Sequence, residues 1–470
     1  MRTPFALAAA AVLATVAVLA AGPVEQSDPK LDQISALIAQ KMTEYGVPGV
    51  AFGIVKNGQA TVKVFGVTNV DDPQPITADT VFALASISKT VTATAMMRLV
   101  EQGKVSLDDP VRKYLPNFKV ADDAATRDVK IWHLLTHTPG WEGQLSSEDR
   151  GVQTLAYFVE TMKDLPKLAA PGEVWSYNNA GFVVAGRVIE VVTGQTIHQA
   201  FRSLVFGPVG LTRAFTRVED LATYRFSVAH RGAPGSVTVS RPLARSTSVA
   251  AGGVSMSIND LLAYGQFHLG DGTAKDGKPV LSRASLELMR TPKVRKNATD
   301  EEMGIGWHLR KVNGVMTAAH GGTLGHCLLV ELVPERNLAM AILTNHSDGW
   351  RLIQDVERSA LRLLENMPLG PSQSIGHRGV NETLPEVTLL SKQPDPAEYT
   401  GVYRKPPSGM NTVAVRDGQL TVDNNTIGFF APDRAVMTSG NGRGNPLEFI
   451  RDGSGAVRWI RVVGRIARKE

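Results

Sequence analysis

The residue pair in this sequence best suited to chemistry is Ser86 and Lys89, in the stretch ALASISKTVTATAMM. At the start of a helix, positions three apart lie on one face about one turn from each other. A serine hydroxyl becomes a good nucleophile when an adjacent base takes its proton. Among apolar neighbours the lysine amine loses hydration and its pKa falls, so it can accept that proton near neutral pH. The helix N-terminus favours the anion that develops beside the serine. The pair predicts an activated serine, although the same spacing also occurs at ordinary helix starts.

A second candidate set is Tyr177 and Asn179, in the run SYNN after a proline-glycine turn at 169–172. The phenol of Tyr177 can accept the serine proton if a nearby cation lowers its pKa. The amide of Asn179 can hold Lys89 or a substrate carbonyl. The structural alternative is that an asparagine caps a helix over 180–192, with the tyrosine half-buried beside it. The two interpretations are compatible.

A third set is the run His320-Gly321-Gly322-Thr323, which precedes an apolar strand at 327–333. Glycines at the end of a strand let a substrate backbone approach closely. The backbone N–H of Thr323 could then join that of the predicted nucleophile as an oxyanion hole. Taken alone, the run also fits a glycine turn with a surface histidine.

In this order, the three sets resemble the motifs of a family of serine hydrolases. That family includes class C β-lactamases, low-molecular-weight penicillin-binding DD-peptidases, D-aminopeptidases and related esterases. Its motifs are S-x-x-K, then Y-x-N, then K-T-G or a variant such as H-x-G. Four further stretches resemble the family's scaffold, at 107–116, 133–140, 171–190 and 250–265. The resemblance covers about residues 30–365. The chain has Y-N-N where class A β-lactamases have S-D-N, which indicates the class C branch of the family.

The resemblance implies a fold and a mechanism. The fold is an antiparallel sheet with helices on its faces and a helical insertion; pattern alone predicts only α+β or mixed α/β. The mechanism is acyl transfer through an ester on Ser86, on ester, amide or D-amino-acid peptide substrates. Lys89 and Tyr177 share the proton, Asn179 positions the lysine or the substrate, and 320–323 contact the substrate. The alternatives are a true β-lactamase or DD-carboxypeptidase, and a non-catalytic penicillin-binding sensor or scaffold.

His320 departs from the β-lactamase pattern, which has a lysine at this position. Lysine is a permanent cation that pairs with the carboxylate of penicillins and cephalosporins. Histidine has an unperturbed pKa near 6.5 and is mostly neutral at pH 7. We therefore expect weak binding of anionic β-lactams that improves toward pH 6, and better hydrolysis of neutral esters or amides.

The chain divides into four segments. Residues 1–21 have the positive start and apolar run of a signal peptide, which predicts a secreted or periplasmic protein, with an uncleaved membrane anchor as the alternative. Residues 22–365 form the predicted hydrolase domain, and 366–396 are a proline-containing linker. Residues 397–470 alternate short strands with Asp-Gly turns and resemble the lipocalin-like domain of some of these hydrolases, a small antiparallel barrel without an obvious catalytic set.

Composition narrows the function classes. Net charge is +5, but the sequence has no dense Lys/Arg run with interleaved aromatic residues. Nucleic-acid binding is therefore not expected. Cys327 is the only cysteine, which excludes an internal disulfide. His133 and His137 have zinc-helix spacing but lack the glutamate of H-E-x-x-H, so they are interpreted as hydrogen-bonding scaffold. No metal and no cofactor is expected. The expected partner is a small-molecule or peptide substrate, and no later segment predicts a membrane span; the oligomeric state is left open.

Overall fold

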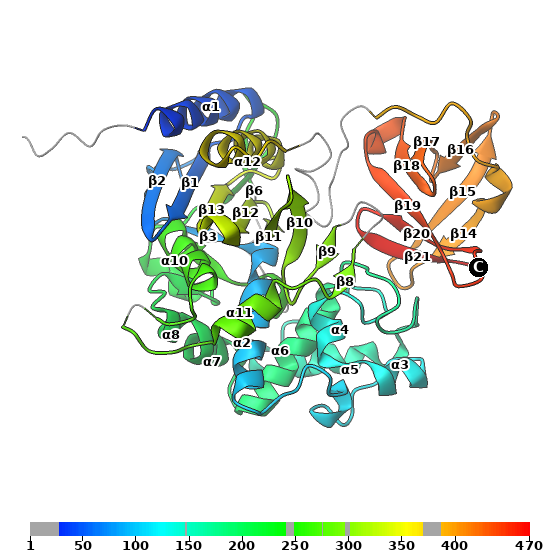
Figure 1. Cartoon of the computed structure of the whole chain (residues 1–470), viewed down its shortest axis with the longest axis horizontal. Coiled ribbons are helices and arrows are strands. Elements are labelled where there is room, and N and C mark those ends of the chain that lie inside the picture. The colour runs from blue at the N-terminus through cyan, green and yellow to red at the C-terminus, as the bar shows by residue number, and fades with distance from the viewer. Residues whose placement is uncertain (1–27, 146–147, 241–248, 275, 297–300, 370–386) are drawn as a thin grey trace, which may run out of the picture.

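An eight-stranded antiparallel sheet forms the centre of the body, residues 28–369, in the order β2-β1-β13-β12-β11-β10-β9-β8 (Figure 1). The computed structural model describes residues 28–145, 148–240, 249–274, 276–296, 301–369 and 387–470. The strands are β1 Gly49–Lys56, β2 Gln59–Gly66, β8 Val294–Arg295, β9 Glu302–Met303, β10 His308–Val312, β11 Val315–Thr323, β12 Cys327–Val333 and β13 Leu338–Thr344. The predicted combination of an antiparallel sheet with flanking helices is confirmed.

Two hairpins bring the ends of the body together in this sheet. Asn57 and Gly58 both have positive φ, 51° and 81°, the geometry that a tight turn between β1 and β2 requires. β12 and β13 pair in register from Cys327 with Thr344 to Val333 with Leu338. β13 also pairs with β1, so the last strand of the body lies beside the first. Every residue of β12 and β13 is buried, because helices cover both faces of the sheet.

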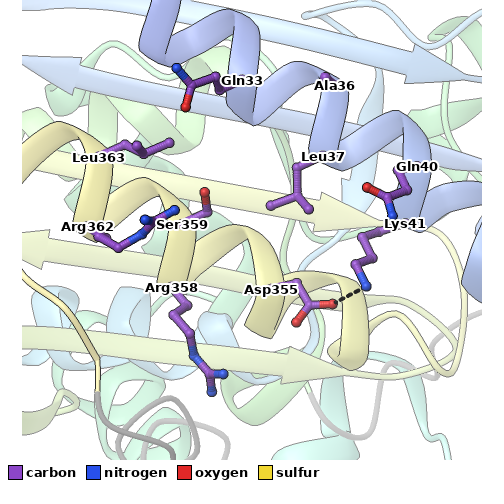
Figure 2. Close-up of a pocket in the computed structure, with 10 residues that line it drawn as sticks. All are labelled: Gln33, Ala36, Leu37, Gln40, Lys41, Asp355, Arg358, Ser359, Arg362 and Leu363. Carbon is purple, nitrogen blue, oxygen red and sulfur yellow. Dashed lines mark ion pairs between the residues drawn. The ribbon is translucent and has the colours of Figure 1, made fainter.

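The first and last helices of the body cover one face of the sheet. These are α1 (Pro29–Tyr45), which Asp28 caps through the N–H of Lys30, and α12 (Trp350–Glu365). Their buried residues share an apolar cluster with strands β1, β12 and β13. Figure 2 shows the groove between their outer sides, about 630 Å³ in volume, where Lys41 Nζ lies 3.2 Å from Asp355 Oδ2.

The other face carries the helical region around α2 (Ser88–Glu101), which is almost entirely buried. The remaining helices are α3 Asp123–Asp128, α4 Ile131–Leu135, α5 Thr154–Glu160, α6 Asn179–Thr193, α7 Ile197–Phe201, α8 Gly207–Val209, α9 Val249–Gly252, α10 Ile258–Leu269 and α11 Arg283–Met289. Small sheets lie among them: β3 Val81–Ala83 with β7 Ser255–Ser257 and β4 Ala214–Phe215, and β5 Ala229–Arg231 with β6 Thr238–Ser240. This region holds the start of α2 against the sheet.

The C-terminal segment is a closed antiparallel barrel, as predicted (Figure 1). Its strands are β14 Gly401–Arg404, β15 Met410–Arg416, β16 Gln419–Val422, β17 Asn425–Ala431, β18 Arg434–Met437, β19 Pro446–Arg451, β20 Val457–Val462 and β21 Arg465–Lys469. Tyr403, Phe429 and Phe449 lie in its core. The barrel packs on the body through an apolar cluster in which Trp459 and Ile466 meet Leu168 and Val174.

The predicted signal peptide, 1–21, and most of the predicted linker lie outside the described residues. Among the helices that the structure does describe, none is by itself long and apolar enough for a membrane span. The pair Asn179–Thr193 and Ile197–Val209 reaches the required length and composition together, but it is bent by 82°.

Candidate active site

Ser86 lies in a single 3₁₀ turn, Ala85–Ile87, that runs directly into α2. Ala85 has φ of 47°, a left-handed conformation that costs a non-glycine residue roughly 1–2 kcal/mol and that is concentrated at functional sites. Ser88 holds this turn: its Oγ donates to the carbonyl of Ala85 at 2.6 Å and accepts from the N–H of Val254 at 2.9 Å. The serine side chain is therefore presented from a fixed backbone.

The Lys89 amine lies 3.1 Å from Ser86 Oγ and donates to the carbonyl of Ala251, in α9, at 2.6 Å. The lysine is fully buried. Burial lowers the pKa of Lys89 well below 10.5, and the charge of Arg465 lowers it further. The lowered pKa favours the unprotonated amine, whose lone pair can accept the serine proton.

The Tyr177 side chain lies beside the same pair, and the Ser86 hydroxyl lowers the pKa of its phenol. The Lys89 amine lies 5.0 Å from the centre of the tyrosine ring. Burial raises the pKa of Tyr177 to about 12, against the opposing effects of the Ser86 hydrogen bond and the Arg465 charge. The structure thus brings together the three residues that the sequence motifs singled out as nucleophile and proton carriers.

The two asparagines after the tyrosine have different positions. Asn178 caps α6: its Oδ1 accepts from the N–H of Gly181 at 2.8 Å, and its Nδ2 donates to the carbonyl of Trp141 at 2.7 Å. The amide of Asn179 instead donates to Gln144 Oε1 at 3.1 Å. Asn178 thus makes the predicted cap, whereas Tyr177 is buried and not half-buried as that alternative expected. Asn179 bonds Gln144 rather than the lysine, which leaves contact with substrate as its predicted role.

β11 carries the run 320–323 past the nucleophile. A Cβ on Gly322 would lie 2.2 Å from the carbonyl oxygen of Leu84, two residues before Ser86. The lack of a side chain at Gly322 therefore lets the backbone of Leu84 approach closely. The sequence had predicted that a substrate backbone would approach there. Thr323, at the end of β11, accepts a hydrogen bond from Trp350 Nε1 at 2.7 Å through its Oγ1. The backbone N–H groups of Thr323 and Ser86 remain the predicted oxyanion hole. Gly321 lies between His320 and Gly322, the residue in close contact with Leu84.

We expect Gly322→Ala to destabilise the protein and to impair acylation together. The new methyl would meet backbone at Leu84, which cannot move without displacing the nucleophile turn, and overpacking of this kind costs about 1–3 kcal/mol. Thermal unfolding and the acylation rate measure the two effects. Gly453→Ala is the matched control, because a Cβ there meets nothing within 4 Å. A Gly322→Ala protein with wild-type melting and acylation would contradict the close contact.

His320 is buried rather than exposed. Its Nδ1 lies 2.7 Å from the carbonyl of Gly321, which can only accept, so Nδ1 carries the proton. Burial lowers the pKa of His320 to about 3. The prediction that His320 gains a positive charge toward pH 6 is therefore wrong. The unperturbed histidine pKa does not apply to a side chain buried on β11, between β10 and β12. The surface-histidine alternative is wrong for the same reason, since 1 % of the side chain is exposed.

Two buried histidines lie beside the Tyr177 ring, and a third, His320, lies close to them. His137 stacks on Tyr177 with ring centres 4.5 Å apart, and His308 lies parallel to it at 6.4 Å. One ring nitrogen from each of these two and one from His320 lie within 4.8 Å of one another. His137 Nδ1 accepts the N–H of Asn178 at 2.8 Å, and His133 Nδ1 accepts that of Lys130 at 2.9 Å. Both histidines of the zinc-like spacing thus make the hydrogen bonds that were predicted for them.

Two further cations reach this region, and sequence reasoning missed both. Lys296 is buried and paired with Glu301 Oε2 at 3.0 Å, with its amine 5.3 Å from the ring of Trp175. Arg465 comes from β21 of the barrel, and its guanidinium lies 5.5 Å from the centre of the Tyr177 ring. Neither stands in a motif, and only the packing of the barrel and of the β8–β9 hairpin brings them here.

Comparison with known proteins agrees with this geometry. A family model described as Beta-lactamase matches residues 34–363. The chain belongs to the β-lactamase family. Penicillin-binding protein 4 of Amycolatopsis lactamdurans is 34% identical to this family member over 68% of the chain and 86% of its own length. Esterase EstB of Burkholderia gladioli is 32% identical over 38% of the chain and 50% of its own length. The crystal structure of SurE superposes with a TM-score of 0.79 at 24% identity, covering 94% of this chain and 99% of that one, barrel included.

Proposed function

We propose that the chain is an exported serine hydrolase that transfers acyl groups through an ester on Ser86. The observation that carries the proposal is the lysine amine 3.1 Å from Ser86 Oγ and 5.0 Å from the centre of the Tyr177 ring. Relatives named as an esterase and as a penicillin-binding protein support esters, amides or D-amino-acid peptides as the substrate class. The signal-like segment 1–21 supports export.

The first half-reaction forms the ester. Burial makes charge costly on both proton carriers, so the resting state is a neutral Lys89 amine beside a neutral Tyr177 phenol. The amine takes the hydroxyl proton as Ser86 Oγ bonds to the substrate carbonyl carbon. The tetrahedral oxyanion is held by the backbone N–H groups of Ser86 and Thr323, and each such donor contributes about 3–4 kcal/mol in comparable sites. Collapse expels the leaving group, which takes a proton from the lysine–tyrosine pair.

The second half-reaction is hydrolysis of that ester. A water molecule gives its proton to the same pair and its oxygen to the acyl carbon, and Ser86 Oγ leaves with a proton returned from the pair. The lysine and the tyrosine titrate as a coupled unit, so apparent pKa values from a pH–rate profile belong to the pair. The chemistry requires no group beyond these side chains, the backbone donors and water.

A substrate panel tests the proposal. Purified protein is given a nitrophenyl ester, a chromogenic cephalosporin and D-amino-acid amides, with the acyl adduct mapped by mass spectrometry. We expect turnover of the ester or the amides, an adduct on the peptide that contains Ser86, and no effect of EDTA. Stable labelling by penicillin with no turnover of any substrate would favour the sensor alternative. Preferred turnover of the cephalosporin would favour a β-lactamase, and loss of activity with EDTA would contradict the mechanism.

The ratio of cephalosporin to ester efficiency should be nearly independent of pH between 5.5 and 8.5. The pKa of His320 is lowered to about 3, so the histidine gains its proton only far below this window and adds no cation for the cephalosporin carboxylate. The efficiencies of wild type and of the neutral variant His320→Gln should therefore change with pH in parallel, within about twofold. A wild-type ratio that rises several-fold toward pH 5.5, while the variant's ratio stays flat, would show that His320 titrates there.

A further inference from the structure

The turn between β20 and β21 of the barrel is bonded to the backbone that carries Tyr177. This turn contains Val463 and Gly464, both with positive φ, 50° and 72°, as a tight two-residue hairpin requires. The carbonyl of Gly464 accepts the N–H of Tyr177 at 2.8 Å. One residue earlier in the body, Ser176 Oγ accepts the N–H of Ile466 at 3.1 Å. The barrel hairpin and the tyrosine segment are thus fixed to each other by one main-chain hydrogen bond and by one to the Ser176 hydroxyl.

Arg465, the first residue after this turn, is held in place over the tyrosine ring. Its Nη1 lies 3.3 Å from Glu142 Oε1, and its Nη2 donates to Gln144 Oε1 at 2.9 Å. The side chain of Arg465 is 13% exposed and that of Glu142 is 2% exposed, so the pair is shielded from solvent. Ser408, from another loop of the barrel, donates to Glu142 Oε2 at 2.7 Å. The guanidinium is therefore a fixed cation rather than a mobile surface charge.

We propose that Arg465 is a positioning residue of the active site, supplied by the barrel, which fixes the Tyr177 phenol against Ser86 and stabilises the phenolate that forms during proton transfer. The proposal rests on the proposed function, because it concerns the same proton transfer. A guanidinium 5.5 Å from the ring centre is within the range of a cation–π contact and strengthens when it is shielded from water. The barrel then has a part in the reaction, although it contributes no group that touches the substrate.

The charges around Tyr177 determine the sign of the effect. Lys89 and Arg465 are the basic groups at the ring, His137 and His308 stack beside it, and Glu142 lies behind the arginine. Burial lowers the pKa of His137 well below its usual value, so this ring adds no charge near neutral pH. The Arg465 charge lowers the pKa of both Tyr177 and Lys89. Without it, both groups would deprotonate only at higher pH.

Two substitutions and a control test the proposal on a neutral nitrophenyl ester. Arg465→Ala removes the cation and its hydrogen bonds, whereas Arg465→Gln removes the charge but keeps an amide that can bond Gln144. We expect kcat to fall by about 10- to 100-fold in both, with KM changed less than about threefold. The basic limb of the pH profile should move to higher pH, and Arg465→Lys should restore most of the rate. Lys469→Ala, at the far end of β21 where the amine donates to Glu398 O within the barrel, should behave as wild type.

The outcomes separate this proposal from the proposed function. Wild type that forms no adduct on Ser86 would refute the hydrolase itself. A wild type that is acylated, with Arg465 variants of unchanged kcat and pH profile, would refute only the positioning role. A loss confined to substrates that carry a carboxylate would make Arg465 a ligand for that carboxylate and would equally overturn the proposal. If Arg465→Ala melts well below wild type, the result is taken from Arg465→Gln and Arg465→Lys, whose charges differ.

Discussion

Substituting Ser86 by alanine is expected to abolish acylation and to lower turnover by about 10⁴- to 10⁶-fold, to whatever the remaining site achieves without a nucleophile. The hydroxyl is the reactive group that the Lys89 amine contacts, and it also lowers the pKa of the Tyr177 phenol. Alanine removes it without adding volume at the 3₁₀ turn, so folding should be preserved. The measurement is labelling by a fluorophosphonate probe with the adduct mapped by mass spectrometry, together with kcat for the best substrate of the panel.

Ser88→Ala is the matched control, two residues away on the same turn. Its buried hydroxyl donates to Ala85 O and accepts from Val254 N–H, so its loss should cost about 1–3 kcal/mol of stability while the adduct still forms on Ser86. The two measurements thus distinguish the serines. Ser86→Ala should lose labelling and keep its melting temperature, whereas Ser88→Ala should keep labelling and melt at a lower temperature. Labelling that persists in Ser86→Ala would overturn the choice of nucleophile.

The parts of the site that were predictable from sequence depend on local geometry. Ser86 and Lys89 come together because three positions at a helix start make one turn, and the structure puts their side chains 3.1 Å apart. The β1–β2 hairpin followed from Asn57 and Gly58, which both adopt the left-handed backbone that such turns need. Two hairpins of the barrel, β15–β16 and β19–β20, followed in the same way from short strands that alternate with Asp-Gly turns. In each case the interactions that determine the structure join residues only a few positions apart in the sequence.

The parts that were not predictable depend on packing between distant segments. Arg465 reaches Tyr177 only because the whole barrel packs on the segment around Leu168 and Val174. His320 was assigned an unperturbed pKa near 6.5, but burial between β10 and β12 removes its charge. The left-handed backbone of Ala85 could not be predicted from the sequence, because alanine, unlike glycine or asparagine, does not favour that conformation. Depth of burial and contact across domains are properties of the completed fold.

Lys89→Met is expected to reduce kcat by about 10³- to 10⁴-fold, second only to loss of the nucleophile, because proton transfer from Ser86 Oγ loses its nearest base. Methionine matches the length and the apolar surroundings of the buried side chain. The residual rate should depend on Tyr177, whose pKa is raised to about 12, so activity should climb with pH across the alkaline range. Thr92→Val is a control on the same helix, since its Oγ1 donates to the neighbouring Ala250 carbonyl at 2.6 Å and touches no proton carrier of the site. Wild-type turnover in Lys89→Met would exclude the lysine as base.

The same substitution should change how stability depends on pH. Burial depresses the pKa of Lys89 in the folded state below its unfolded value of about 10.5, so the unfolded chain binds more protons than the folded one in the window between the two values. Wild-type stability therefore rises with pH across that window, by at most about 1.4 kcal/mol per unit, and the benefit is complete above pH 10.5. Lys89→Met lacks this contribution. It loses the hydrogen bond to Ala251 at every pH, which costs about 1 kcal/mol or more, but it also escapes the cost of the buried amine, which is greatest at low pH. Denaturant unfolding of both proteins from pH 6 to 10 should show the variant gaining relative to wild type as pH falls. Parallel curves would mean that Lys89 keeps an ordinary pKa in the folded protein, and an amine charged in that way could not act as the resting base.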